Sequence, residues 1–452
     1  MTNSTQSYVW WGPVAADSIP LNSLIDIGTI VTCDYGTDVQ LMERDKNVFS
    51  LEKKLGVKKP WGDSSVKEIL QEPLKQDIEN FLRNTKKPTI IIPYSSSTSL
   101  ENAVYRNNPA IKIASIPARL KRTLDDKILF RELLKEHDIN FIPGEMVDLQ
   151  REGYSKLAKR YGARFVVQTR FGAGGNNTFL IRGEEDFIRL KKQGGFMEVL
   201  VMPYLNGWSV NVHGVVTDKE VILAQPSIQL IGIKECTRYS FAWCGNDFGF
   251  VRNIDRTLIA MCQDYARVVG ELIRLMGYKG IYGLDLLVDE DAHSVYPIEI
   301  NPRFQGSTAL LTQLEMINKI DPLVGYHLRA YGIDQLGIGG HEHSLITTGS
   351  QIVIHNRHPV SVFAVKQLNA GIYRVKADEL GLVRSGDSLK DCHDEDEFVL
   401  NGGLPLLNQK IKSDAAFASI QTYKSVLQPP ALNKLTPWAQ KVANVLYRHI
   451  LQ

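Results

Sequence analysis

The sequence lacks several features that would each define a class of protein. It has no apolar run long enough to cross a bilayer, and its first residues, MTNSTQSYVWWG, have no apolar core like that of a secretory signal. The net charge is only +2, with acids and bases interspersed, which argues against a nucleic-acid-binding surface. We therefore expect a cytoplasmic protein with no membrane or nucleic-acid partner. The few cysteines lack zinc or redox spacing and are expected to be reduced: Cys33, Cys236, Cys244, Cys262 and Cys392.

Common catalytic and metal motifs are also missing. The sequence has no G-K-[ST], no G-x-S-x-G elbow and no Cys/His frame for a covalent nucleophile. Two histidine pairs, His341 with His343 and His355 with His358, lack cysteine partners and the helical H-E-x-x-H frame. A zinc site is therefore not expected, and the chemistry has to come from another pattern.

The most informative segment is Gly280–Arg303, GIYGLDLLVDEDAHSVYPIEINPR, which predicts a β-hairpin. Two apolar, β-prone runs, Ile281–Val288 and Val295–Ile300, flank a stretch of turn residues. Side chains alternate between the two faces of a strand, so every second residue shares a face. The hairpin is expected to turn about Asp291 and Ala292.

This folding places Asp285 roughly opposite Glu299, with Asn301 on the same face as Glu299. Opposed residues have Cβ atoms about 4.5–5.5 Å apart, where like charges repel. Two carboxylates and an amide oxygen in an apolar sheet therefore favour a bound cation, and hard oxygen ligands favour Mg²⁺ or Mn²⁺ over zinc. The alternative is a solvent-facing polar stripe on an edge hairpin.

The rest of the 452-residue chain suggests two to four lobes of mixed α/β and α+β structure. Strands at Ser23–Cys33 and Thr89–Pro93 alternate with a helix at Ser65–Arg83, which favours a parallel sheet at the start of the chain. An amphipathic helix is expected over Thr123–His137 with Thr123 as its N-cap, and another over Thr257–Met276 that stops at Gly277. After residue 340 the chain is β-rich and ends in a helix at Pro437–Leu451.

A glycine-rich loop, TRFGAGGNN, separates two predicted strands, Ala163–Gln168 and Thr178–Ile181. The backbone N–H groups exposed by Gly172, Gly174 and Gly175 can surround phosphate oxygens. No helix follows the loop, so it is neither a P-loop nor a dinucleotide fingerprint. Taken by itself, the loop is better explained as a plain hairpin turn.

Taken together, the loop and the motif GLDLL…YPIEINPR resemble the ATP-grasp superfamily over roughly Pro117–Thr312. The resemblance implies that Asp285, Glu299 and Asn301 hold Mg²⁺ or Mn²⁺, with Glu299 bridging two ions. It implies that Arg303 neutralises the phosphoryl group in transfer, so that Arg303 and Glu299 are the catalytic residues.

The resemblance also assigns the ATP contacts. Lys127, Gly172, Gly174 and Gly175 would bind the phosphates. Backbone groups of Met202, Pro203 and Leu205 would read the adenine, and Asn211 stands where many members have a ribose-side or metal-side acid. Gln168 replaces the lysine that members usually have before the loop, and Arg170 could supply the missing charge. Near the acceptor pocket the candidates for substrate contact are Lys234, Arg238, Asn246, Gly306 and Ser307.

By this resemblance we expect an N-terminal α/β (pre-ATP-grasp) domain at 1–116, a central lobe at 117–196, a C lobe at 197–340 and a separate β-rich C-terminal module at 341–452. The whole is similar to the biotin-carboxylase-like branch, which includes amino-acid and peptide ligases. The implied reaction joins a small carboxylate to an amine through an acyl phosphate and releases ADP and phosphate. A homodimer is compatible with it. The alternatives are a biotin-dependent carboxylase-like subunit and a nucleotide-binding regulatory protein with weak turnover.

Overall fold

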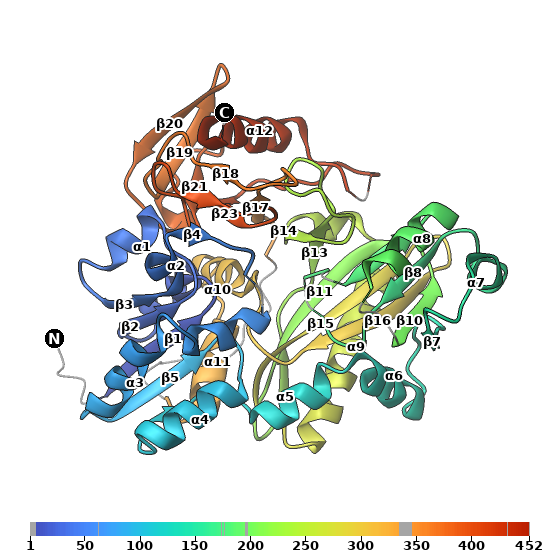
Figure 1. Ribbon diagram of the computed structural model, residues 1–452, viewed down its shortest axis with the longest axis horizontal. Helices are drawn as coiled ribbons and strands as arrows, with labels where there is room; N and C mark the ends of the chain where they lie inside the picture. The colour runs from blue at the N-terminus through green and yellow to red at the C-terminus, as the bar shows by residue number, and fades with distance from the viewer. Residues whose placement is uncertain are drawn as a thin grey trace.

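A computed structural model of the chain describes residues 6–61, 63–172, 174–175, 177–194, 198–333, 346–431 and 433–451. His341 and His343 lie outside these ranges. In Figure 1 the N-terminal part lies at the left in blue, the middle of the chain at the right in green and yellow, and the C-terminal part above them in orange and red. Among the described residues, no helix combines the length and the apolar character needed to cross a membrane.

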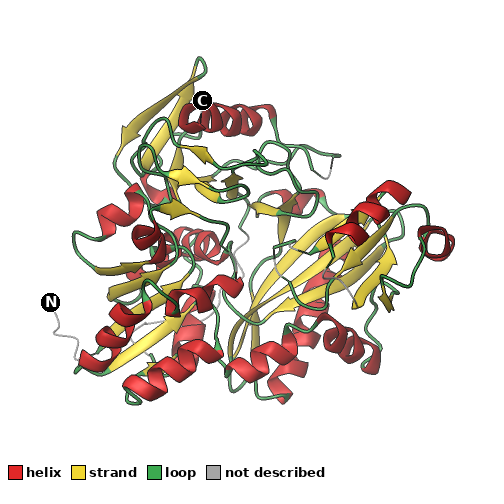
Figure 2. Cartoon of the chain, viewed as in Figure 1, coloured by secondary structure: helices red, strands yellow, loops and turns green. Residues whose placement is uncertain are grey.

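The N-terminal part is built on a parallel sheet, as the alternation of strands and helices predicted. Its order is β3 (Asn47–Ser50), β2 (Ile27–Thr32), β1 (Ser7–Gly12), β5 (Thr89–Pro93) and β6 (Lys112–Ile113). Figure 2 shows helices flanking these strands. They are α1 (Thr37–Met42), α2 (Leu51–Leu55), α3 (Lys75–Asn84) and α4 (Thr98–Asn107), with 3₁₀ turns η1 (Ala15–Ser18), η2 (Pro20–Ser23) and η3 (Asp63–Leu70).

The central lobe carries the glycine loop on a small antiparallel sheet. The strands follow the order β7 (Glu145–Asp148), β10 (Glu198–Pro203), β8 (Phe165–Gln168) and β9 (Thr178–Ile181). The helices α5 (Ala118–Leu124) and α6 (Lys127–Glu136) lead into this lobe, and α7 (Tyr154–Tyr161) and α8 (Glu184–Gln193) belong to it.

A long antiparallel sheet holds the acidic hairpin at one end. Its first strands are β16 (Ser294–Asn301), β15 (Gly280–Asp289), β11 (Trp208–Val216), β13 (Ser227–Ile231) and β14 (Trp243–Asp247), and β12 (Val221–Leu223) pairs with β11. The predicted register is confirmed, because Asp285 pairs with Glu299 and Gly283 pairs with Asn301. A bulge follows Asp285. The helices of this lobe are α9 (Arg256–Leu275), α10 (Thr308–Ile317) and α11 (Leu323–Ala330), with η4 (Phe250–Asn253).

The C-terminal module does not have a main sheet of its own. Strand β14 pairs with β17 (Ser350–His355), so the long sheet continues through β23 (Ala416–Thr422), β21 (Phe398–Asn401), β19 (Gly371–Lys376) and β20 (Glu379–Arg384). One hydrophobic cluster runs with it, from Leu286 on β15 to Ile352 on β17 and Val442 on α12 (Pro437–Leu451). The C-terminal part is β-rich, as expected, and its strands extend the long sheet of the C lobe. A small sheet of β18 (Val362–Phe363), β22 (Lys410–Ile411) and β4 (Val57–Lys58) connects the C-terminal module to the N-terminal part. The module also contains the 3₁₀ turn η5 (Leu389–Asp391).

The expected helix over Thr123–His137 is divided in the structure, and Thr123 is not its N-cap. Helix α5 ends at Leu124, and α6 begins at Lys127 with Asp126 as N-cap. The carboxylate of Asp126 accepts hydrogen bonds from the backbone N–H groups of Ile128 (3.1 Å) and Leu129 (3.4 Å). The break leaves the first backbone N–H groups of α6 without partners inside the helix, and the carboxylate of Asp126 accepts hydrogen bonds from two of them.

Helix α10 carries a buried acid. Glu315 on α10 is 1% exposed, and one of its oxygens accepts a hydrogen bond from the backbone N–H of Leu323, the first residue of α11 (2.9 Å). Burial raises the pKa of this carboxyl from 4.5 to about 8, partly offset by that hydrogen bond. Between these pH values the folded protein keeps a proton that the unfolded chain releases, so stability falls as the pH rises.

Glu315→Gln should remove this contribution, because the amide keeps an acceptor for Leu323 and does not titrate. The free energy of unfolding of wild type should fall relative to the variant by up to about 1.4 kcal/mol per pH unit between pH 5 and 8. Urea unfolding of both proteins across this range measures the difference. A difference that stays constant with pH would show that Glu315 ionises normally.

Candidate active site

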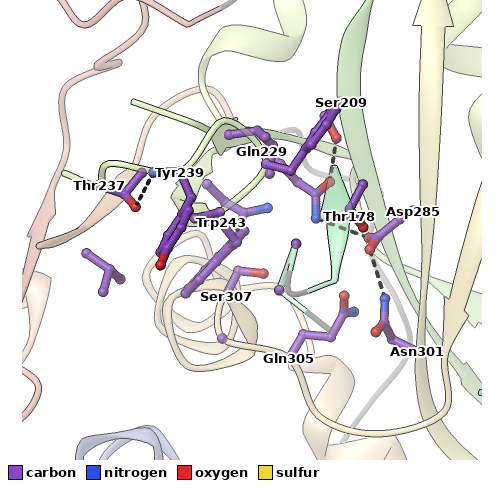
Figure 3. Close-up of a pocket in the computed structure, with 18 of the residues that line it drawn as sticks. Thr178, Ser209, Gln229, Thr237, Tyr239, Trp243, Asp285, Asn301, Gln305 and Ser307 are labelled. Carbon is purple, nitrogen blue, oxygen red and sulfur yellow. Dashed lines mark hydrogen bonds between the residues drawn. The ribbon is translucent and has the colours of Figure 1, made fainter. Parts of the chain in front are cut away.

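The acidic hairpin forms the floor of the site, with Asp285 held by three amide groups. Asn211 (2.6 Å), Gln229 (3.1 Å) and Asn301 (2.9 Å) each donate a hydrogen bond to its carboxylate. Figure 3 shows Gln229 and Asn301 reaching Asp285 from different sides. Burial, and next the charge of Glu299, raise the pKa of Asp285 to about 7. The opposed carboxylates therefore strain the site electrostatically, as the sequence predicted.

Lys127 brings a positive charge to this pair from another lobe. Its ammonium group forms an ion pair with Glu299 and donates a hydrogen bond to the carbonyl oxygen of Gly172 (3.0 Å). Lys127 is the first residue of α6, and its side chain is only 5% exposed. The structure thus brings together the helix lysine, the glycine loop and the acidic hairpin, which are far apart in the sequence.

Arg303 completes the charged group. Its guanidinium donates hydrogen bonds to the side-chain oxygen of Asn301 (2.8 Å), to the carbonyl oxygen of Phe304 (2.9 Å) and to the hydroxyl of Tyr94 (3.4 Å). Asn301 donates to Asp285 and accepts from Arg303, so its amide links the guanidinium to the acidic hairpin.

The donor set fits Mg²⁺. Asp285, Glu299 and Asn301 all line the same cavity and offer hard oxygen atoms. Among the described residues no group of three or more His, Cys, Asp or Glu side chains could hold a metal ion, so a cation here would use two carboxylates and an amide. That ligand type separates this site from a zinc site.

The glycine loop closes over the same cavity. Gly175 has φ +81°, and a Cβ atom there would lie 1.8 Å from the carbonyl oxygen of Phe241. The backbone N–H of Trp243 donates to the carbonyl oxygen of Gly174 (3.4 Å). Only glycine fits this close approach, which explains why the loop needs a glycine at this position. Gln168, at the start of the loop, is buried and donates a hydrogen bond to Thr178 (3.1 Å).

An apolar slot lies beside the loop. Met202, Pro203 and Leu205 line it, together with the apolar side chains of Ile142, Val166, Leu287 and Ile298. An apolar lining of this kind can pack against an aromatic ring. Asn211 does not line the cavity, and supports Asp285 from behind.

The charge expected from Arg170 is used elsewhere. Its guanidinium forms an ion pair with Asp126 (2.7 Å), the N-cap of α6, and the side chain is 45% exposed. Arg170 does not line the cavity. The contact of Arg170 with Asp126 thus secures the start of α6.

The acceptor candidates divide into two groups. Gly306, Ser307 and Asn246 line the cavity. By contrast, Lys234 is exposed beside Glu235, and Arg238 is held by Asp414 (2.7 Å) outside the lining.

The cavity of about 460 Å³ also has walls that the motifs did not reveal. The C-terminal strands contribute Gln351, Val353 and His355 from β17 and Ser419 and Gln421 from β23. Gln229 and Gln305 come from the C lobe, and Asp17, Trp61 and Tyr94 from the N-terminal part. Alternate residues of a strand share a face, so the spacing of Gln351, Val353 and His355 could have placed them on one face of a strand. Nothing in the sequence near them indicated that this face lines the cavity.

Residues 124–307 match the family model of the ATP-grasp domain. The chain therefore contains an ATP-grasp domain, with homologues among carboxylate–amine ligases. The large chain of carbamoyl phosphate synthase from Pyrococcus furiosus is 26% identical over 283 residues, covering 59% of this chain and 25% of that protein. Butirosin acyl-carrier protein–L-glutamate ligase from Niallia circulans is 25% identical over 232 residues, covering 49% of this chain and 52% of that protein. The matched part is thus about a quarter of one relative and about half of the other.

The fold is similar to that of the biotin carboxylase domain of Hydrogenobacter thermophilus 2-oxoglutarate carboxylase, determined with MgADP and bicarbonate. The TM-score is 0.59 at 13% identity, and the match covers 93% of this chain and 86% of that one. At this identity the likeness shows the fold alone. It extends past the ATP-grasp domain into the N-terminal and C-terminal parts.

Glu299→Gln tests the cation site. The change relieves the repulsion with Asp285 and weakens the ion pair with Lys127, so the metal-free variant should melt close to wild type. Because one carboxylate ligand is gone, the extra rise in melting temperature that Mg²⁺ produces with ATP should disappear. Differential scanning fluorimetry with and without Mg²⁺ measures both effects.

The matched control is Glu290→Gln, which makes the same change in an exposed residue of the same hairpin. This variant should keep the full response to Mg²⁺. An unchanged response in Glu299→Gln would rule out Glu299 as a metal ligand.

Proposed function

We propose that this protein is an ATP-dependent ligase that activates a small carboxylate, such as an amino acid, as an acyl phosphate and joins it to an amine. The observation that carries the proposal is the meeting of Lys127, Glu299, Gly172 and Arg303 at one end of a cavity that the glycine loop covers. Cationic groups and backbone N–H groups directed at a phosphate are the parts that phosphoryl transfer requires.

ATP would bind with its adenine in the slot of Met202, Pro203 and Leu205 and its phosphates under Gly172, Gly174 and Gly175. Lys127 would bind the terminal phosphates, and the glycine loop would exclude water. When bound by Asp285, Glu299 and Asn301, Mg²⁺ supplies positive charge that offsets the charge of the triphosphate.

The chemistry needs no covalent attachment to the protein. A carboxylate oxygen of the acid attacks the γ-phosphorus, and ADP leaves with the electron pair of the broken P–O bond. The amine nitrogen then attacks the acyl carbon, phosphate leaves with the electron pair of the broken C–O bond, and the amine loses a proton to water. Arg303, which borders both Asn301 and Tyr94, would stabilise the charge on the transferring phosphoryl group.

The cavity walls support a polar second substrate. Gln229, Gln305, Gln351 and Gln421 present neutral amides, and Ser307 lies among them. We infer that the long sheet, including its C-terminal strands, sets the choice of acceptor. A homodimer stays a prediction.

Lys127→Ala should weaken ATP binding by about 1.5–3 kcal/mol, the range for a hydrogen bond to a charged group. Adenosine binding should hardly change, because the slot for the base is untouched. Isothermal titration of both ligands measures this difference, and Lys135→Ala, an exposed lysine on the same helix, is the matched control. If adenosine and ATP lose affinity equally, Lys127 has a structural role.

A screen of carboxylates paired with amines tests the reaction itself. Phosphate release should require one acid together with one amine, and hydroxylamine in place of the amine should trap the activated acid as a hydroxamate. Turnover that depends on bicarbonate, with no requirement for another acid, would identify a carboxylase instead. ATP binding without any turnover would indicate a regulatory protein.

A further inference from the structure

A second cavity, of about 520 Å³, lies on the other side of the catalytic residues. It shares Gly172, Glu299, Asn301 and Arg303 with the main cavity and is also lined by Lys127. From these residues it extends to the turn between β5 and α4 in the N-terminal part. The two cavities therefore meet where phosphoryl transfer is proposed, and the second leads there from a different direction.

The two cavities differ in the charged side chains that line them. Among the described residues that line the second cavity, two carboxylates, Asp125 and Glu299, are each paired with a lysine, Lys121 and Lys127. The remaining ionised side chains are cationic: Lys67, Arg122 and Arg303. In the main cavity the described lining has four acids against Arg303, and two of these acids, Glu299 and Asp414, are paired with Lys127 and Arg238. The second cavity thus has a surplus of positive charge that attracts anions.

The far wall of the second cavity has a group of polar atoms suited to an anion. Residues Ser95, Ser96, Ser97 and Thr98 form the turn that leads into α4, a helix of 10 residues. Ser97 is the N-cap, and its hydroxyl accepts a hydrogen bond from the backbone N–H of Leu100 (3.2 Å). The N-terminus of a helix favours negative charge.

Ser96 is the unusual member of this turn. It lines the cavity, is only 7% exposed, and its hydroxyl has no hydrogen-bond partner among the described residues. A buried hydroxyl without a partner is costly, so such groups are rare and call for an explanation. An acceptor atom of a ligand in the cavity would provide the missing partner.

Arg122 is a second residue of this lining whose side chain is available to a ligand. It lies on α5, exposed, with its guanidinium 5.9 Å from the ring centre of Phe171, a residue of the glycine loop. Among the described residues it has no carboxylate partner. Its neighbour Arg119 is on the same helix and is also exposed, but does not line the cavity.

We propose that the second cavity binds an oxyanion group of the acid substrate, with Ser96, the N-terminus of α4 and Arg122 as its contacts. The assignment to the acid rests on the proposed ligase function. In this arrangement the acid reaches the γ-phosphate from the cationic side, while the nucleotide occupies the main cavity. The same chemistry would also suit the inorganic phosphate released in the reaction, and the experiment has to separate these two sources.

The test uses the full chain saturated with Mg²⁺ and the non-hydrolysable analogue β,γ-imido-ATP, so that the nucleotide's own phosphate positions are filled. Inorganic phosphate and succinate are titrated separately and in competition by calorimetry. Both should bind to wild type and compete with each other. Ser96→Ala and Arg122→Ala should each weaken binding by about tenfold, and Arg119→Ala should leave it unchanged.

Ser96→Ala should melt at or above the temperature of wild type, because it removes an unpaired buried hydroxyl. A lower melting temperature with unchanged anion binding would show that Ser96 is structural and would overturn the proposal. So would loss of phosphate binding when the nucleotide analogue is present.

Phosphate binding without competition by succinate would reassign the cavity to the phosphate product. These titrations measure binding alone and need no turnover. If the protein binds both anions through Ser96 but joins no acid to an amine, the ligase function is refuted and the oxyanion site remains.

Discussion

The opposition of Asp285 and Glu299 across one strand pair is the constraint on which the site depends. In an apolar sheet two facing carboxylates need compensating charge or hydrogen bonds, and here the central lobe and the C lobe provide them. Lys127 comes from the start of α6, while Asn211, Gln229 and Asn301 donate hydrogen bonds to Asp285 or lie beside it on the long sheet. The acidic pair therefore specifies how the central lobe sits on the hairpin, as well as what the cavity can bind.

The continuous sheet has a similar consequence for the C-terminal part. Asp247 at the end of β14 accepts hydrogen bonds from Ser425 (2.7 Å) and from the backbone of Val426 (2.7 Å) and Leu427 (3.1 Å), which secures the last segment of the chain beside the C lobe. On the opposite side, the carboxylate of Asp38 accepts hydrogen bonds from the backbone of Gly402 (3.0 Å) and Gly403 (2.8 Å). The C-terminal strands are thus held between the N-terminal part and the ATP-grasp domain, where they can wall the main cavity.

The sequence predicted the features that depend on local patterns. The hairpin register follows from two apolar runs and a turn, and α9 and α12 lie within a residue of their expected bounds because their amphipathic patterns are clear. The break between α5 and α6 was missed, since Thr123 and Asp126 are both residue types that cap helices and the local pattern does not distinguish them. The walls formed by Gln351 and Gln421 could not be predicted, because they depend on the pairing of β14 with β17 and of β17 with β23 over long sequence separations. Ser96 was missed because nothing about a serine in a turn shows that its hydroxyl lacks a partner.

The central claim is that Asp285 and Glu299 face each other in order to hold a divalent cation with the nucleotide. Electron paramagnetic resonance of Mn²⁺ titrated into the protein with ADP tests this most directly, because the free ion and the bound ion give distinct signals. The account predicts that wild type binds Mn²⁺ when ADP is present and that Asp285→Asn weakens this binding by at least about tenfold. Equal binding of Mn²⁺ by the two proteins would contradict it.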